Sequence, residues 1–178
     1  MKKRSVVLFS LLAMLLLVVT GCGTPKAEVG MNELTLKQLE KKLDNHETFL
    51  LLTFAEKDEY VKKTKFIEAW DDSLTRAGLT GFYVNLQDQD EKTIKELERK
   101  YKHPKSDEWD AVEDGLVLVE NGGIQTDAGG AGKVRGLIEG RAHENQSFLA
   151  EDEIKRLDRG VSHALEYIQY YKIELTEY

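Results

Sequence analysis

The sequence contains a single cysteine, Cys22, and only two prolines among 178 residues. One cysteine cannot form a disulfide within the chain, so folding depends on the burial of apolar side chains. A thiol pair for disulfide exchange is absent for the same reason. The chain also has no excess of basic residues. Its net charge is −7, which excludes binding to nucleic acid through a general electrostatic field.

The N-terminal apolar run is shorter than the roughly 20 residues that a membrane-spanning helix needs. It extends from Val6 to Val19, is interrupted only by Ser10, and follows three basic residues at positions 2–4. A step of small residues, Thr20-Gly21, then precedes Cys22. A basic head, an apolar run and a small-residue step are the parts of a secretory signal.

The residues Val19, Thr20, Gly21 and Cys22 resemble a lipobox, the cleavage motif of bacterial lipoproteins. The resemblance implies that the chain is cut before Cys22 and that this thiol carries diacylglycerol. The alternative is an ordinary signal or anchor helix with an incidental cysteine. Two acyl chains hold a protein durably at a membrane, whereas one binds reversibly. We therefore expect a signal peptide over 1–21, a lipidated tether over 22–32, and a domain over 33–178 at the extracytoplasmic face of the cell membrane.

Hydrophobic periodicity divides the expected domain into alternating helices and strands. Thr35 and Gln38 form a capping box that predicts the start of the first helix, and Asp90 predicts the start of another. The sequence Asn121-Gly122-Gly123 predicts a hairpin turn. Helices are expected from Thr35, over 58–77, from Asp90 and over 151–171, and strands over 49–54, 82–86, 115–120 and 124–127. Residues 134–138 are read as extended and 141–148 as a polar loop.

This order predicts an α/β fold with a mixed sheet of about four strands flanked by helices. Residues 35–101 followed by 115–124 resemble a thioredoxin-fold domain. They are similar in particular to the small thioredoxin-like lipoproteins of low-GC Gram-positive bacteria, including the bacteriocin-transport accessory proteins. The resemblance implies a thioredoxin-like domain that ends in a C-terminal helix.

The redox signatures of that family are missing from this sequence. A redox thioredoxin carries Cys-x-x-Cys after its first core strand, where this chain has residues 55–61 and no cysteine. The place of the family's cis-proline is taken by Glu113 and Asp114. If these two loops meet, they form an acidic patch that can recognise a basic partner. The patch would consist of Glu56, Asp58, Glu59, Tyr60, Glu113 and Asp114, and the alternative is a solvated helix start.

Other patterns that carry chemistry do not complete a site. The glycine-rich stretch 128–133 lacks the first glycine and the Ser or Thr of a phosphate-binding loop. The four histidines share no metal spacing, and no catalytic residue, metal or cofactor is predicted.

The leading hypothesis is a non-redox binding or accessory domain, whose partner is an envelope protein or a secreted peptide. The alternatives are a hydrolase that uses the same cleft, and a bacteriocin or peptide transport accessory or immunity lipoprotein.

Overall fold

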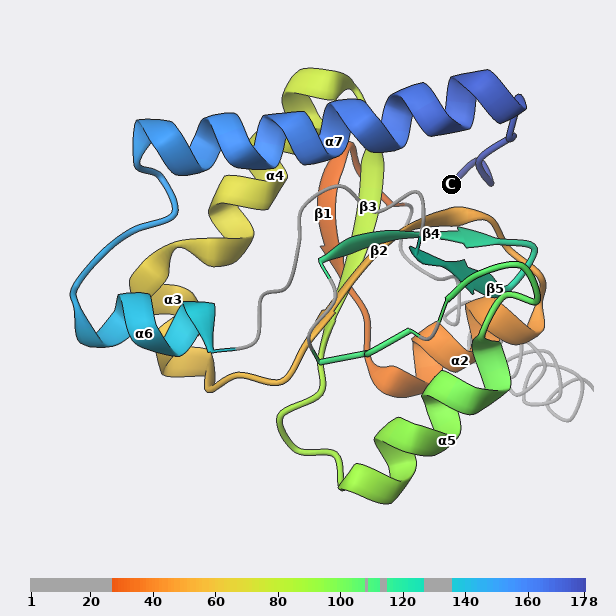
Figure 1. The fold of residues 1–178 in the computed structure, drawn as a ribbon, viewed down its shortest axis with the longest axis horizontal. Coiled ribbons are helices and arrows are strands. Elements are labelled where there is room, and N and C mark those ends of the chain that lie inside the picture. Colours follow the sequence, from red (N-terminus) through yellow and green to blue (C-terminus); the bar gives the residue numbers. More distant parts are fainter. Residues whose placement is uncertain (1–26, 108, 113–114, 127–135) are drawn as a thin grey trace, which may run out of the picture.

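A computed structural model describes residues 27–107, 109–112, 115–126 and 136–178 of the chain. The described residues form an α/β fold with five strands in one mixed sheet and six helices (Figure 1). The strand order is β1-β3-β2-β4-β5. Strands β1, β3 and β2 run parallel, whereas β4 is antiparallel to β2 and β5 is antiparallel to β4. The predicted α/β class is therefore confirmed. The sheet has one strand more than expected.

The elements of the fold, in chain order, are β1 (Gly30–Glu33), α2 (Leu36–Asp44), β2 (Phe49–Phe54), α3 (Asp58–Thr64), α4 (Phe66–Ala77), β3 (Thr80–Asn85), α5 (Glu91–Tyr101), β4 (Leu116–Glu120), β5 (Gly123–Gln125), α6 (Leu137–His143) and α7 (Glu151–Tyr171).

Strand β2 is the centre of the sheet, as its continuous apolar run predicts. It pairs with β3 on one side and with β4 on the other, and all six of its residues are buried. Alternate side chains point to opposite faces. Leu50, Leu52 and Phe54 therefore join the cluster formed with α4 and α7, while Phe49 and Leu51 join the cluster formed with α2 and α5. Figure 1 shows the resulting layers, with α7 lying across α4 on one face and α2 beside α5 on the other.

The helix starts follow the predicted capping residues. The Thr35 hydroxyl accepts from the Gln38 backbone N–H, and the Gln38 side chain accepts from the Thr35 N–H, which completes the capping box. Asp90 caps α5 by accepting from the Thr93 backbone N–H at 2.7 Å. The hairpin turn is confirmed as well, because Asn121 and Gly122 both adopt positive φ. These features depend on neighbouring residues only, which explains why the sequence predicts them.

Strand β1 was not predicted, and its residues 30–32 belong to the stretch expected to be a tether. Its sequence, Gly-Met-Asn-Glu, is too polar and too short to stand out as a strand. Two distant groups hold it in place. It pairs along its length with β3, and the Met31 backbone N–H donates to the Asp71 carboxylate at 2.7 Å. The tether prediction is therefore wrong for residues 30–32.

The single helix expected over 58–77 is two helices, α3 and α4. Lys65 separates them, because it adopts a left-handed conformation with φ 59°. The Phe148 backbone N–H donates to the Thr64 carbonyl at 2.9 Å, so a segment far along the chain fixes the break. Helical periodicity continues through Lys65 and gives no sign of this break.

Residues 137–143 form helix α6, so the expected extended stretch is wrong at 137–138 and the expected polar loop is wrong at 141–143. Ile138 and Ala142, four residues apart, are both buried. The side of α6 that carries them packs on α3. The positions 134–135 of that prediction lie outside the described residues.

Candidate functional site

The carboxyl ends of the parallel strands β1, β3 and β2 meet at one edge of the sheet, which is where open α/β sheets bind ligands. A cleft of about 410 Å³ lies at this edge. Its walls come from the ends of the strands, from α3 and from the first turn of α4. It is lined by Glu33, Phe54, Asp58, Val61, Lys62, Lys65, Ile67, Glu68, Tyr83 and Asn85.

Asn85, the last residue of β3, ties the loop after β2 to the sheet. Its side-chain amide donates to the Glu56 carbonyl at 2.7 Å and to the Asp58 carboxylate at 2.9 Å. Its side-chain oxygen accepts from the Glu56 backbone N–H at 3.2 Å. Three hydrogen bonds from one side chain therefore hold the loop after β2 to the end of β3.

Helix α3 carries charges of both signs. Asp58 and Glu59 lie in its first turn, where the helix dipole favours negative charge, and Lys62 and Lys63 lie in its last turn. Two of these side chains, Asp58 and Lys62, line the cleft together with Lys65. The predicted patch is therefore not uniformly acidic, because lysines of the same helix and its break lie among the carboxylates.

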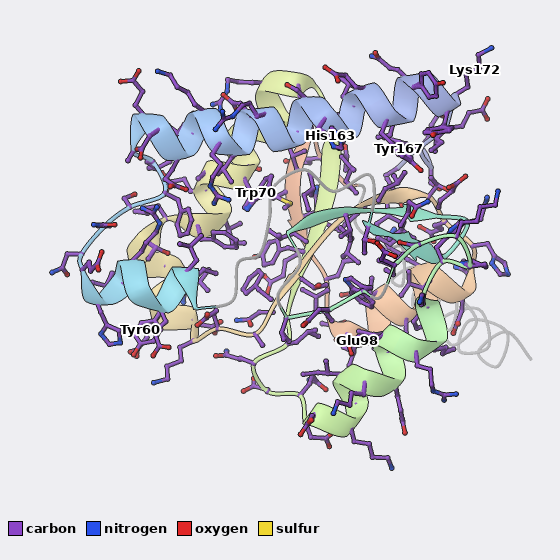
Figure 2. All side chains as sticks on the ribbon, in the orientation of Figure 1. Tyr60, Trp70, Glu98, His163, Tyr167 and Lys172 are labelled. Atoms are coloured by element: carbon purple, nitrogen blue, oxygen red, sulfur yellow. The ribbon has the colours of Figure 1, made fainter. Side chains whose placement is uncertain are left out.

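The structure brings together only some of the residues that the sequence assigned to the patch. Asn85 contacts both Glu56 and Asp58, because its side chain accepts from the Glu56 backbone N–H and donates to the Asp58 carboxylate. Glu59 is exposed on α3. Tyr60 faces α6, where its ring centroid is 5.4 Å from that of His143, and Figure 2 places it at the contact between α3 and α6. Positions 113 and 114 lie outside the described residues.

Tyr83 and Phe54 form the aromatic floor of the cleft. Their rings are stacked with centroids 6.2 Å apart. The Glu33 carboxylate, at the end of β1, lines the cleft beside Tyr83. Burial, followed by the negative charge of Glu33, raises the pKa of Tyr83 to about 12. Tyr83 therefore remains a neutral hydrogen-bond donor at physiological pH.

Of the ten residues that line the cleft, the sequence reasoning assigned only Asp58 to a site; the residues it missed include Glu33, Lys65, Tyr83 and Asn85. Glu33 belongs to the unpredicted strand β1, and Lys65 to the unpredicted helix break. Tyr83 and Asn85 were placed on a strand, and only the parallel pairing of β3 with β1 and β2 brings them to the edge. The one signal in the sequence that could have indicated these positions is the polar residue at the end of β1 and of β3, Glu33 and Asn85.

The arrangement suits the recognition of a polar ligand. Ammonium groups of Lys62 and Lys65, carboxylates of Asp58 and Glu68, and the neutral Tyr83 hydroxyl surround an apolar floor. Across the described residues, no three His, Cys, Asp or Glu side chains are grouped closely enough to hold a metal ion. None of the described helices is both long and apolar enough to cross a bilayer.

Comparisons with known proteins place the chain in no family. No family model matches it, and no curated protein or solved structure is significantly similar to it.

Proposed function

We propose that the protein is a lipoprotein held at the extracytoplasmic face of the cell membrane, whose thioredoxin-like domain binds a partner without redox chemistry. The arrangement of the sheet supports the fold part of this proposal. Two parallel strands, β2 and β3, followed by an antiparallel hairpin, with helices on both faces, match the layout that the thioredoxin resemblance implies, and β1 is an additional strand. Helix α7 takes the place of the expected C-terminal helix, with the bounds that the sequence predicted.

One observation carries the functional part. At the start of α3, where the redox family has its two thiols, the chain has Lys57, Asp58, Glu59 and Tyr60, and Asn85 holds this segment by hydrogen bonds. Without a thiolate there is no nucleophile for disulfide exchange. The groups that remain can form ion pairs and hydrogen bonds, so the edge of the sheet is suited to binding.

The only cysteine of the sequence, Cys22, has a separate role in the proposal. It lies five residues before Ala27, the first described residue, which packs against the core cluster of α2 and α5. Five residues span at most about 18 Å when fully extended. Lipid on Cys22 would therefore keep the domain close to the bilayer.

The anchoring is tested by replacing Cys22 with Ala and labelling cells with a palmitate analogue. The unmodified chain should take up label and partition into the detergent phase, and Cys22→Ala should do neither. Label that persists in the variant would contradict the lipoprotein proposal.

The binding proposal is tested separately. The purified protein should show no insulin-reductase activity, and activity that survives Cys22→Ala would refute the non-redox proposal. Glu59→Lys should weaken capture of a partner from an envelope extract, more at low salt than at high salt, because exposed charges are screened. Glu96→Lys is the matched control, since Glu96 is exposed on α5 away from the cleft. Equal capture by both variants would show that the cleft edge is not the binding surface.

A further inference from the structure

A second groove lies at the other end of the molecule, beside the end of α7. Its volume is about 540 Å³. Three segments far apart in the sequence form it: the turn between α2 and β2, the hairpin turn between β4 and β5, and the segment 171–176. The lining residues are His46, Thr48, Glu120, Asn121, Tyr171, Lys172, Ile173, Glu174, Leu175 and Thr176.

Hydrogen bonds through Thr48 hold the three segments together. The Thr176 backbone N–H donates to the Thr48 carbonyl at 2.8 Å, and the Thr48 N–H donates to the Thr176 hydroxyl at 2.9 Å. The Thr48 hydroxyl in turn accepts from the Asn121 backbone N–H at 3.0 Å. The walls of the groove are therefore fixed before any ligand arrives, which lowers the entropic cost of binding.

The backbone is strained on all three sides of this groove. Five non-glycine residues have positive φ in the described part of the chain, and three of them line the groove: His46 (58°), Asn121 (50°) and Lys172 (53°). The left-handed conformation is unfavourable for a non-glycine residue, though less so for Asn. Such strain concentrates at sites of recognition, and here it lies in one place.

A pair of exposed tyrosines borders the groove. Tyr170 is 79% exposed and Tyr171 is 59% exposed, and their rings meet edge to face with centroids 4.9 Å apart. Tyr167 packs against Tyr171, with ring centroids 4.5 Å apart. The Tyr167 hydroxyl accepts from the Gln125 side-chain amide at 3.2 Å. Figure 2 shows Tyr167 on the side of α7 that faces the hairpin. Ordered aromatic side chains of this kind are typical anchors of protein interfaces.

The charge around the tyrosines is predominantly negative. Glu120 and Glu174 line the groove, and Glu166 lies four residues before Tyr170 on α7, so it is a neighbour on the same helix face. Lys172 is the one lysine in the lining, and Figure 2 shows it at the end of α7, extending away from the body of the protein. Carboxylates and the faces of tyrosine rings both attract cations, so the two features favour the same ligand.

We propose that the groove and its tyrosine pair are a docking surface for a basic segment of a partner protein, whose lysine or arginine side chains lie over the rings and between the carboxylates. This surface is separate from the cleft at the carboxyl ends of the strands and does not depend on the lipid anchor. An anionic membrane surface is not its ligand, because the acidic rim repels it.

The test uses the full-length chain in detergent and a fluorescent ten-residue peptide of alternating lysine and glycine, followed by fluorescence anisotropy. The double variant Tyr170→Ser/Tyr171→Ser leaves the net charge unchanged and should weaken binding roughly five- to thirty-fold. Glu120→Gln/Glu174→Gln should weaken binding at least five-fold at low salt and less at high salt. Tyr171→Trp should restore binding to the Tyr170→Ser background, because indole is the better cation–π partner.

The control is Glu91→Gln/Glu96→Gln, which removes the same charge from the exposed face of α5 and should change affinity less than two-fold. If the two glutamate variants lose the same affinity, the peptide responds only to the overall charge and the groove is not a site. If the tyrosine variant binds as tightly as the parent while its circular dichroism spectrum is unchanged, the tyrosine pair has no part in binding and the proposal fails.

Discussion

The replacement of Leu51 by Ala tests whether β2 is the centre of the core. Leu51 is fully buried, and its partners in the sheet are Phe82 of β3 and Val117 of β4, which are buried as well. Its side chain belongs to the cluster that also contains Leu39 and Leu43 of α2. Neighbours therefore surround the position from two strands and a helix and cannot all close the gap that truncation leaves.

The expected loss of stability follows from the atoms removed. Three carbon groups at about 0.8 kcal/mol each contribute about 2.4 kcal/mol from the transfer term alone. The unfilled cavity adds to this, so the free energy of unfolding should fall by about 2.4–5 kcal/mol. A domain is typically stable by about 5–15 kcal/mol, so Leu51→Ala removes a large share of the free energy of unfolding. With a urea m value of about 2 kcal/mol/M, the unfolding midpoint should fall by roughly 1–2.5 M.

Urea unfolding followed by circular dichroism measures this shift. The chain should begin at Gly23 because β1 starts at Gly30 and must be retained. Leu51→Met keeps the volume and should cost less than about 1.5 kcal/mol. Val29→Ala is the exposed control, since Val29 is 54% exposed, and should change stability by less than about 0.5 kcal/mol. A loss below about 1 kcal/mol for Leu51→Ala, with m unchanged, would refute the burial of this position.

Three further changes test other parts of the structure. Gly122→Ala should destabilise the fold by more than the roughly 1–2 kcal/mol that a left-handed alanine costs. Gly122 has φ 78°, and an added Cβ would also lie 2.2 Å from the Leu43 carbonyl oxygen. A variant with unchanged stability in urea unfolding would contradict this packing. Thr35→Ala removes the cap of α2 and should cost about 0.5–2 kcal/mol in urea unfolding, while an unchanged midpoint would show that the cap contributes nothing. The pKa of Tyr83 rises from 10.0 to about 12 on folding, so the folded state holds the phenol proton more tightly than the unfolded state. The resulting contribution to the free energy of unfolding is complete below pH 10 and is lost as the pH rises through 12. Unfolding measured from pH 9 to 12 should therefore show a decline in stability that is shallower in Tyr83→Phe, and identical slopes would refute the assignment.

Features that depend on neighbours in sequence were predicted correctly. The Thr35 capping box, the Asp90 cap and the Asn121-Gly122 turn each involve residues within three positions of one another. The bounds of α7 and the burial of β2 followed from hydrophobic periodicity and from a continuous apolar run. Such signals survive in any tertiary context because the interactions behind them are local.

The candidate cleft could be predicted only in part. The sequence located the loop after β2 and its carboxylates, Glu56 and Asp58. It did not locate Glu33 or Asn85, because their place in the site depends on which strands pair and in what register. The break at Lys65 depends on a hydrogen bond from Phe148, which is 84 residues further along the chain than Thr64.

The sequence by itself determined the α/β class, the order of most elements, the central strand and the absence of a thiol pair, since composition, caps and periodicity encode these directly. Only the tertiary structure decided that a polar stretch at Gly30–Glu33 becomes a strand, and that charges of both signs meet at the edge of the sheet. It also decided that two turns and the end of α7 with Tyr171 share one groove, and that the rings of Tyr167 and Tyr170 pack against Tyr171. These features arise from contacts between residues far apart in the chain, and such contacts are fixed only when the core packs and the strands choose their partners.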